Sequence, residues 1–252
     1  MRTLTVGVVL VVSLLAAVPL FALNPGGSPV IIPVIGRFAG SGGTQWQTDV
    51  FLSNPYSPTQ IVTLKFYHSG STMKEATVTM GPFSTITLPD IVLNTFGFTS
   101  AGGMLEVFVA ESSTILARAA IYNTGNPAGQ FGQGIPGIAT RLLSRQAYLH
   151  GLSGVDGSRV NIGVANPNDT AVQVTIRVAT DTNDQLHSRS VTVAPHAYVQ
   201  YNDIFATFGI EPRAGVQVNF TTAGEELIYG YSSEVRNDTG DAIFNFGTSP
   251  NS

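Results

Sequence analysis

Apolar and polar residues alternate with a period of two along several segments of this chain, as expected of β-strands that bury one face on a core. In the clearest segment, 172–179, every second residue is Val or Ile. The same alternation predicts strands over 160–164 and, in the first half of the chain, over 48–52 and 62–66. Shorter segments predict further strands at 84–88, 103–109, 115–122, 197–201, 215–221 and 227–235.

The chain contains an internal duplication. TDVFLSNPYSPTQIVTLKFY returns as VNIGVANPNDTAVQVTIRVA, with Asn54 and Asn166 112 residues apart (166 − 54). Phe96 and Phe208, each followed by Gly, have the same spacing (208 − 96). A one-residue slip would turn every apolar side chain to the other face, so the two copies keep one register. We therefore expect an all-β protein of two tandem β-sandwich modules, Ig-like or jelly-roll-like, with about seven strands each.

Turn residues separate the predicted strands. An Asn-Pro pair lies between 48–52 and 62–66, and another follows 160–164, so each pair of strands is expected to form a hairpin. One short helix is expected in each module. Its first turn is capped by Asp90 or Asp203, and a glycine ends it.

The N-terminal segment has the pattern of a secretory signal peptide. Arg2 precedes an apolar stretch, and the segment closes on small residues at Ala22. An uncleaved membrane anchor is the alternative, because residues 4–21 carry no charge and a span needs about 18 apolar residues. We expect cleavage near Ala22 and a secreted protein, either extracellular or periplasmic.

Composition limits the class of protein further. The chain has no cysteine, so packing rather than disulfides must stabilise it. Only 11% of its residues are charged, and its formal net charge is −4. Because Lys65 and Lys74 are its only lysines and it has no basic run, nucleic acid is excluded as a partner.

These features predict four segments. They are a signal peptide at 1–22, a linker at 23–32, a first β-sandwich module at 33–138 and a second at 139–252.

The order of motifs resembles β-sandwich repeats of secreted and surface bacterial proteins. Those motifs are an Asn-Pro that ends a strand, an alternating strand, the step Val193-Ala194-Pro195, an Asp-capped turn and the strand Ile115 to Ala119. The chain is also similar, more distantly, to the sensory rhodopsin transducer family. The resemblance covers roughly residues 33–250 and implies a non-catalytic extracellular module. The second copy departs from the pattern, because Leu227 to Tyr231 replaces the segment that contains Ala117-Arg118.

No constellation of catalytic or metal-binding residues is visible. The four histidines lack the spacing of a zinc site, and the segment 151–155 misses a G-x-S-x-G elbow by one residue. The loop 181–184 has acidic residues but lacks the Gly and distal Glu of a calcium loop, so we expect a hairpin tip. Carboxylates for sugar hydrolysis could come only from Glu225, Glu226, Glu234, Asp238 and Asp241, which the sequence does not place together. We expect no enzyme, no metal and no cofactor.

Aromatic residues distinguish the two copies. Trp46, Phe51, Tyr56 and Tyr67 stand where the second copy has Ser158, Gly163, Asn168 and Ala179. An exposed aromatic face is typical of contacts with proteins or sugars. The alternative is that this face packs against the second module or against the closing strand of the first. These four aromatic residues are the candidate binding residues.

The function expected from these observations is a non-catalytic structural or adhesive interaction module, secreted or at the cell surface. A carbohydrate-binding module that uses the aromatic residues of the first module is the alternative. The expected partner is an extracellular protein or a glycan. A membrane would be involved only through an uncleaved leader.

Overall fold

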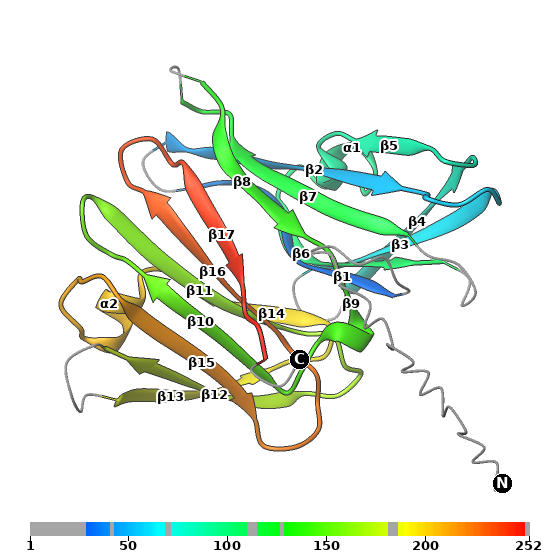
Figure 1. Ribbon diagram of the computed structural model, residues 1–252. Coiled ribbons are helices and arrows are strands. Elements are labelled where there is room, and N and C mark those ends of the chain that lie inside the picture. Colours follow the sequence, from blue (N-terminus) through cyan, green and yellow to red (C-terminus); the bar gives the residue numbers. More distant parts are fainter. Residues whose placement is uncertain are drawn as a thin grey trace, which may run out of the picture.

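The computed structural model describes residues 29–40, 43–68, 72–109, 115–126, 129–180 and 186–249. The expected signal peptide and the expected hairpin tip at 181–184 lie outside these residues. Within them the strands pair in antiparallel ladders and the two α-helices are short, so the prediction of an all-β protein is confirmed (Figure 1).

The first half contains nine strands and one helix among the residues described. They are β1 (Val30–Ala39), β2 (Gln45–Ser53), β3 (Gln60–His68), β4 (Thr72–Met80), β5 (Thr85–Leu88), α1 (Ile91–Asn94), β6 (Ala101–Phe108), β7 (Leu116–Asn123), β8 (Phe131–Pro136) and β9 (Ile138–Ala139). β1 begins at Val30, within the segment expected to be a linker.

The second half follows a short 3₁₀ turn, η2 (Thr140–Leu142). Its elements are β10 (Gln146–Leu152), β11 (Ser158–Asn166), β12 (Val172–Ala179), β13 (Leu186–Val193), β14 (Ala197–Tyr201), α2 (Ile204–Phe208), β15 (Val216–Thr222), β16 (Tyr229–Arg236) and β17 (Ala242–Phe246).

The order of strands is the same in the two halves. The second half has two sheets, β10-β15-β12-β13 and β14-β11-β16-β17. Each of these strands corresponds to the first-half strand nine numbers lower. In the first half the path β4-β3-β6-β1-β2-β7-β8, with β5 paired to β2 beside it, contains the corresponding neighbours. There, β1 pairs first with β6 and then, at Phe38 and Ala39, with β2, so it joins the two sets of strands into one sheet.

The predicted hairpins across the Asn-Pro pairs are wrong. β2 pairs with β1, β5 and β7, whereas β3 pairs with β4 and β6. In the second half β11 and β12 belong to different sheets. The two strands that flank each Asn-Pro loop both show the alternation because they face the same hydrophobic core from opposite sides. They are β2 and β3 in the first half and β11 and β12 in the second. The Asn-Pro loop therefore carries the chain from one sheet to the other in the second half, and from one set of strands to the other within the single sheet of the first half.

The two predicted helix caps differ. The Asp203 carboxylate accepts hydrogen bonds from the backbone N–H groups of Phe205 and Ala206, as expected of a cap, and Gly209 ends α2 with a φ of 66°. Asp90 occupies the same position before α1 but makes no side-chain cap bond. Its carboxylate instead pairs with the Arg37 guanidinium at 2.7 Å, because β1 brings that positive charge to the start of α1.

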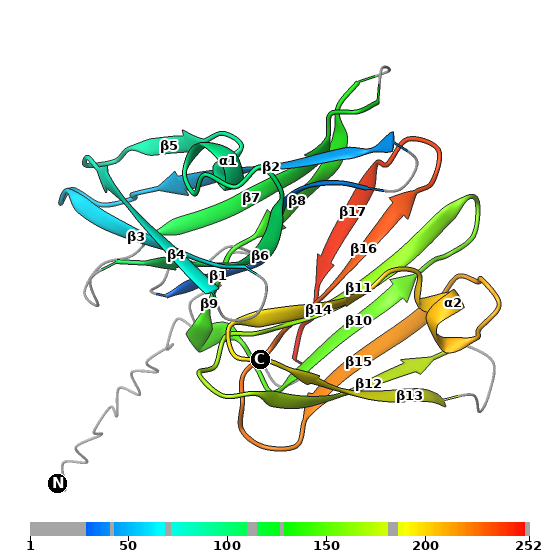
Figure 2. The same cartoon turned by 180° about the vertical axis from the view of Figure 1, so that it is seen from behind.

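Each half has a hydrophobic cluster. The cluster of the second half contains residues of that half, whereas the cluster of the first half also contains residues of the second. The second-half cluster joins side chains from β10, β11, β12, β15 and α2. The first-half cluster also takes in Ala165, Tyr229 and Tyr231, which belong to the second half. Tyr198, Phe244 and Phe246 pack against it as well. One face of the β14-β11-β16-β17 sheet thus covers the first half, which places the two halves side by side (Figures 1 and 2).

Candidate functional site

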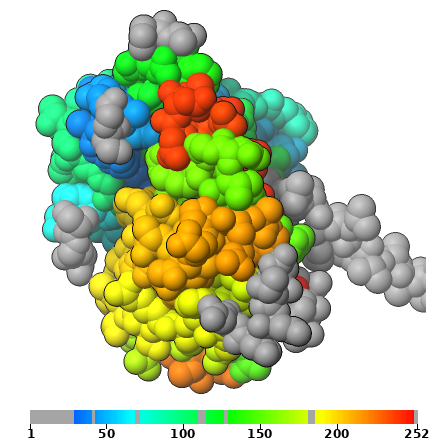
Figure 3. All heavy atoms as spheres, turned by 90° about the vertical axis from the view of Figure 1, so that its left-hand side faces the viewer, coloured from blue at the N-terminus to red at the C-terminus, as the bar shows by residue number. Residues whose placement is uncertain are grey.

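A crevice of about 380 Å³ lies where the two halves meet. It is lined by Gly43, Thr44, Trp46, Asn123, Gly125, Asn126, Arg159, Arg236, Asn237, Asp238, Thr239 and Gly240. The first six come from the start of β2 and the end of β7, and the others from β11 and the β16–β17 turn. Figure 3 shows that turn, in red, close to the blue β1 and β2 segments. The lining is mostly polar, with one large aromatic side chain.

The first-half wall is built around Trp46. Its indole is partly buried and projects from β2 beside Asn123 of β7, its partner in the ladder. The Asn123 side-chain oxygen accepts hydrogen bonds from the backbone N–H groups of Gln45 at 2.8 Å and Gly125 at 2.9 Å. This amide therefore fixes the backbone of both strands at the point where the indole enters the crevice.

The second-half wall is the turn that joins β16 to β17. The Arg236 guanidinium bonds both carboxylate oxygens of Asp238, at 3.3 and 3.2 Å, and this lowers the pKa of the Asp238 carboxyl. Arg159, from β11, donates to the Asn237 side-chain oxygen at 2.6 Å. The positive charge of Arg236 thus has an acidic partner, whereas Arg159 donates to a neutral amide.

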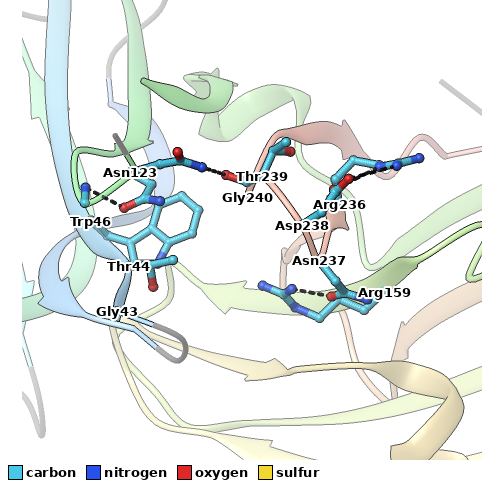
Figure 4. A pocket seen from close by; sticks show the side chains of 12 residues that line it. Gly43, Thr44, Trp46, Asn123, Arg159, Arg236, Asn237, Asp238, Thr239 and Gly240 are labelled. Carbon is cyan, nitrogen blue, oxygen red and sulfur yellow. Dashed lines mark hydrogen bonds and ion pairs between the residues drawn. The ribbon is translucent and has the colours of Figure 1, made fainter. Parts of the chain in front are cut away.

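The two walls touch each other at one end of the crevice. The Asn126 side-chain amide donates to the Thr239 carbonyl oxygen at 3.2 Å. Gly240 lies against the indole, because a Cβ on it would stand 3.9 Å from Trp46 Cη2. Figure 4 shows Trp46 and Asn123 on one side, with Arg159 and Asn237 opposite. A ligand in this space would contact both halves at once.

The four aromatic residues singled out from the sequence do not form one face. Trp46 lies in the crevice. Phe51 lies on the outer side of β2 with the Arg118 guanidinium 4.0 Å from its ring centre. Tyr56 is 49% exposed in the β2–β3 loop. Tyr67 lies at the contact between the halves, so the packing alternative applies to it and not to Phe51.

The residues that sequence reasoning missed are those of the second-half wall. Arg159, Asn237 and Thr239 lie far from Trp46 in the sequence, and Asp238 was considered only as a candidate for hydrolysis. The signal available was the run RNDTG at 236–240, a polar turn that the first copy lacks.

A second polar cluster lies where Tyr67 meets the second half. The His196 ring stacks on Tyr67 with 4.3 Å between ring centres. Its Nδ1 lies 2.9 Å from Glu106 Oε1, and its Nε2 lies 2.9 Å from Asp169 Oδ1. Glu106 is 3% exposed, and burial raises the pKa of its carboxyl although His196 opposes that shift. Burial and the neighbouring Glu106 also raise the pKa of the Tyr67 hydroxyl.

Two further observations hold for the part of the chain that the structure describes. There, no group of three or more His, Asp or Glu side chains is placed to hold a metal ion. In the same residues, no helix has the length and apolar character needed to cross a membrane.

Comparisons with known proteins found only weak structural similarity to this chain. No family model matches the chain, and no curated protein matches it. Among solved structures, the apo Pleurotus ostreatus lectin is 13% identical, with a TM-score of 0.16 over 91% of this chain and 86% of the lectin. The lectin from Pleurotus ostreatus in complex with GalNAc is 14% identical, with a TM-score of 0.17 over 92% of this chain and 87% of that one. At such TM-scores neither likeness bears on this chain's fold or function.

Proposed function

We propose that this chain is an exported, non-catalytic adhesive protein that binds a glycan in the crevice between its halves. The proposal includes the architecture expected from the sequence, namely two tandem β-sandwich modules that follow a signal peptide. The repeated strand order and the hydrophobic cluster in each half support that architecture.

The observation that carries the proposal is the position of Trp46 opposite a wall of amide and guanidinium groups. A sugar ring has an apolar C–H face that stacks on an indole, while its hydroxyls exchange hydrogen bonds with amides. A space of about 380 Å³ is of the size that holds a small ligand. The crevice offers both kinds of contact within one such space.

Charge favours an acidic sugar. Arg236 is neutralised by Asp238, whereas Arg159 bonds the neutral amide of Asn237 and forms no ion pair with a carboxylate of the described residues. A guanidinium binds carboxylates with strong, charge-assisted hydrogen bonds. A uronic-acid residue with its ring on Trp46 would bring its carboxylate toward this wall.

The state of Asp238 supports binding rather than hydrolysis. A glycosidase needs a carboxylic acid that stays protonated, with a raised pKa, to protonate the leaving group. The pKa of Asp238 is lowered by the Arg236 guanidinium, so this carboxyl is held in its ionised form.

The test is calorimetric titration with galacturonate oligosaccharides and with the matching neutral galactose oligosaccharides. The wild-type chain should bind the acidic series more tightly. Trp46→Ala should remove binding of both series, and Arg159→Gln should remove the preference for the acidic one. Phe51→Ala is the matched control and should bind as the wild type does.

Failure to bind any member of a broad glycan array would overturn the proposal. So would binding that persists in a folded Trp46→Ala chain. Export is tested separately, by N-terminal sequencing of the protein recovered outside the cell, which should begin near residue 23.

A further inference from the structure

The two halves share a turn with an uncommon backbone. Gly81-Pro82-Phe83-Ser84 and Ala194-Pro195-His196-Ala197 each enter the last short strand before a helix. Phe83 has a φ of 48° and His196 a φ of 49°, a region that favours glycine. Both halves therefore hold a large side chain where glycine would be less strained, which indicates that the side chain itself has a use.

In the second half that use is visible. His196 stacks on Tyr67 and reaches Glu106, so the turn of the second half docks on the outer side of β3 and β6 in the first half. Asp169, from the adjacent β11–β12 loop, holds the other ring nitrogen. This turn and loop together form the docking tip of the second half.

In the first half the corresponding tip makes no such contact with the residues that the structure describes. Phe83 is 73% exposed and Tyr56, from the β2–β3 loop, is 49% exposed. The Phe83 backbone N–H donates to the Tyr56 carbonyl oxygen at 3.0 Å and holds the two aromatic residues side by side. The first-half tip thus presents two aromatic side chains, whereas the second-half tip presents an imidazole and the carboxylate of Asp169, which follows the residue that matches Tyr56.

The surface that receives a tip also has a counterpart. The β3–β6 ladder of the first half corresponds to the β12–β15 ladder of the second. The pair Leu64 and Val107 in the first ladder matches the pair Ile176 and Phe220 in the second. Counting along the strands from these pairs, Asn219 takes the place of Glu106 and Ala179 the place of Tyr67. The receiving surface of the second half is therefore the outer side of β12 and β15.

Asn219 points to a missing partner on this receiving surface. Its side chain is only 9% exposed, and among the described residues its Nδ2 has no hydrogen-bond partner. A buried amide without an acceptor is costly, and Glu106 in the same place is satisfied by the docked tip. Asn219 is thus an unsatisfied buried donor at the position where, in the first half, a docked tip satisfies Glu106.

The free tip and the receiving surface also match in size and charge. Inside the chain, an acidic Glu106 meets His196, and the Tyr67 ring fills the contact. In the second pair the matched residues, Phe83 and Asn219, are neutral, and the charged neighbour on the receiving side is Arg177, in the place of Lys65. The small Ala179 leaves room for the larger rings of Phe83 and Tyr56. The aromatic rings thus lie on the tip in this pair, whereas within the chain the ring of Tyr67 lies on the receiving strand. The ionisable His196 and Glu106 are matched by the neutral Phe83 and Asn219.

We propose that the Tyr56–Phe83 tip of one chain docks on the Ala179–Asn219 surface of a second copy, as the His196 tip docks within the chain. The tip and the surface lie at opposite ends of the molecule (Figures 1 and 2). A contact between two different surfaces at opposite ends joins chains head to tail, into rings where the rotation closes and into open filaments where it does not.

The test is sedimentation velocity of the purified chain over a concentration series. The wild type should form species larger than a dimer as its concentration rises. Phe83→Gly removes the ring and relieves the backbone, so it should fold normally and weaken association at least tenfold. Ala179→Tyr should do the same by filling the receiving surface. Ile243→Ser, which alters a side chain that is 65% exposed elsewhere, is the control and should associate as the wild type does.

A mixture of the two variants decides the geometry. Phe83→Gly keeps an intact receiving surface and Ala179→Tyr keeps an intact tip, so together they should form a one-to-one dimer and nothing larger. A wild-type chain that stays monomeric overturns the proposal, and the partner of the tip would then be a different protein. Association that survives both single substitutions also overturns it. Neither result bears on glycan binding at Trp46.

Discussion

Asn54 and Asn166 hold the same pair of loops in the two halves of the chain. The Asn166 Nδ2 donates to the carbonyl oxygens of Thr170, Val193 and Ala194, and its Oδ1 accepts from the Asn168 backbone N–H. Asn54 does likewise with Pro58, Gly81 and Tyr56. Each asparagine ties the loop that crosses between sheets to the turn that precedes β5 or β14.

Replacing Asn166 should therefore destabilise the chain strongly. Asn166→Ala leaves buried carbonyl groups without donors, at a cost of about 3 kcal/mol in the free energy of unfolding. Asn166→Asp, of nearly the same shape, places acceptor oxygens against carbonyl oxygens and should cost at least as much near neutral pH. Urea denaturation measures both. Equal stability of Asn166→Asp and the wild type would contradict this account.

The contact between the halves can be tested at Gly163. A Cβ at this position would lie 2.2 Å from Tyr231 Cζ, so Gly163→Ala must displace the ring. Overpacking of this kind costs about 2 kcal/mol. Gly134→Ala is the matched control, because no atom lies within 4 Å of its added Cβ. Thermal unfolding should show a lower Tm for the first variant and little change for the second.

Asp90 and Asp203 should respond differently to replacement by asparagine. Asparagine caps a helix about as well as aspartate, so Asp203→Asn should change stability by no more than a few tenths of a kcal/mol. Asp90→Asn removes the ion pair with the partly buried Arg37 and should cost about 2 kcal/mol. Chemical denaturation of the two variants compares them directly. A larger loss at Asp203 than at Asp90 would show that the two roles are reversed.

Glu106 gives the chain a pH dependence of definite sign. Burial raises the pKa of Glu106 in the folded state, so the folded chain binds more protons than the unfolded chain above the ordinary carboxyl pKa of 4.5. The contribution of Glu106 to stability is then full below that pKa and is lost as pH rises through the raised value. The groups that face it are His196, Tyr67 and Lys65.

The measurement is the unfolding free energy of the wild type and of Glu106→Gln at several pH values between 4.5 and 8. Relative to the variant, the wild type should gain stability as the pH falls through this range. A difference that stays constant with pH would show that the carboxyl has the same pKa in both states.

The strands could be predicted from the sequence because their signal is local. In 172–179 the alternation of Val or Ile with other residues gives both the strand and its buried face, since neighbouring side chains of a strand point to opposite sides. The same alternation does not say which strand is the neighbour. For this reason β2 and β3 were expected to pair, although the loop at Asn54 carries the chain to another part of the sheet.

The crevice could be predicted only in part. Trp46 stood out because the second copy has a serine at the matching position. Arg159 gives no such signal, and Asn237 gives only that of the polar run RNDTG, because both reach Trp46 through the packing of one half on the other. That packing depends on side chains of β16 and β17 and on η2, and the alternation within a strand does not say which distant surface its side chains meet.

Tyr229 and Tyr231 belong to the hydrophobic cluster of the first half although they lie near the end of the chain. A ribosome makes β16 and β17 after all the strands of the first half, so the face of the first half that they cover stays open to solvent until they have been made. The first half is thus synthesised first, but its hydrophobic cluster is complete only after β16 of the second half has been made. A chain that stops before Tyr229 leaves both halves unfinished.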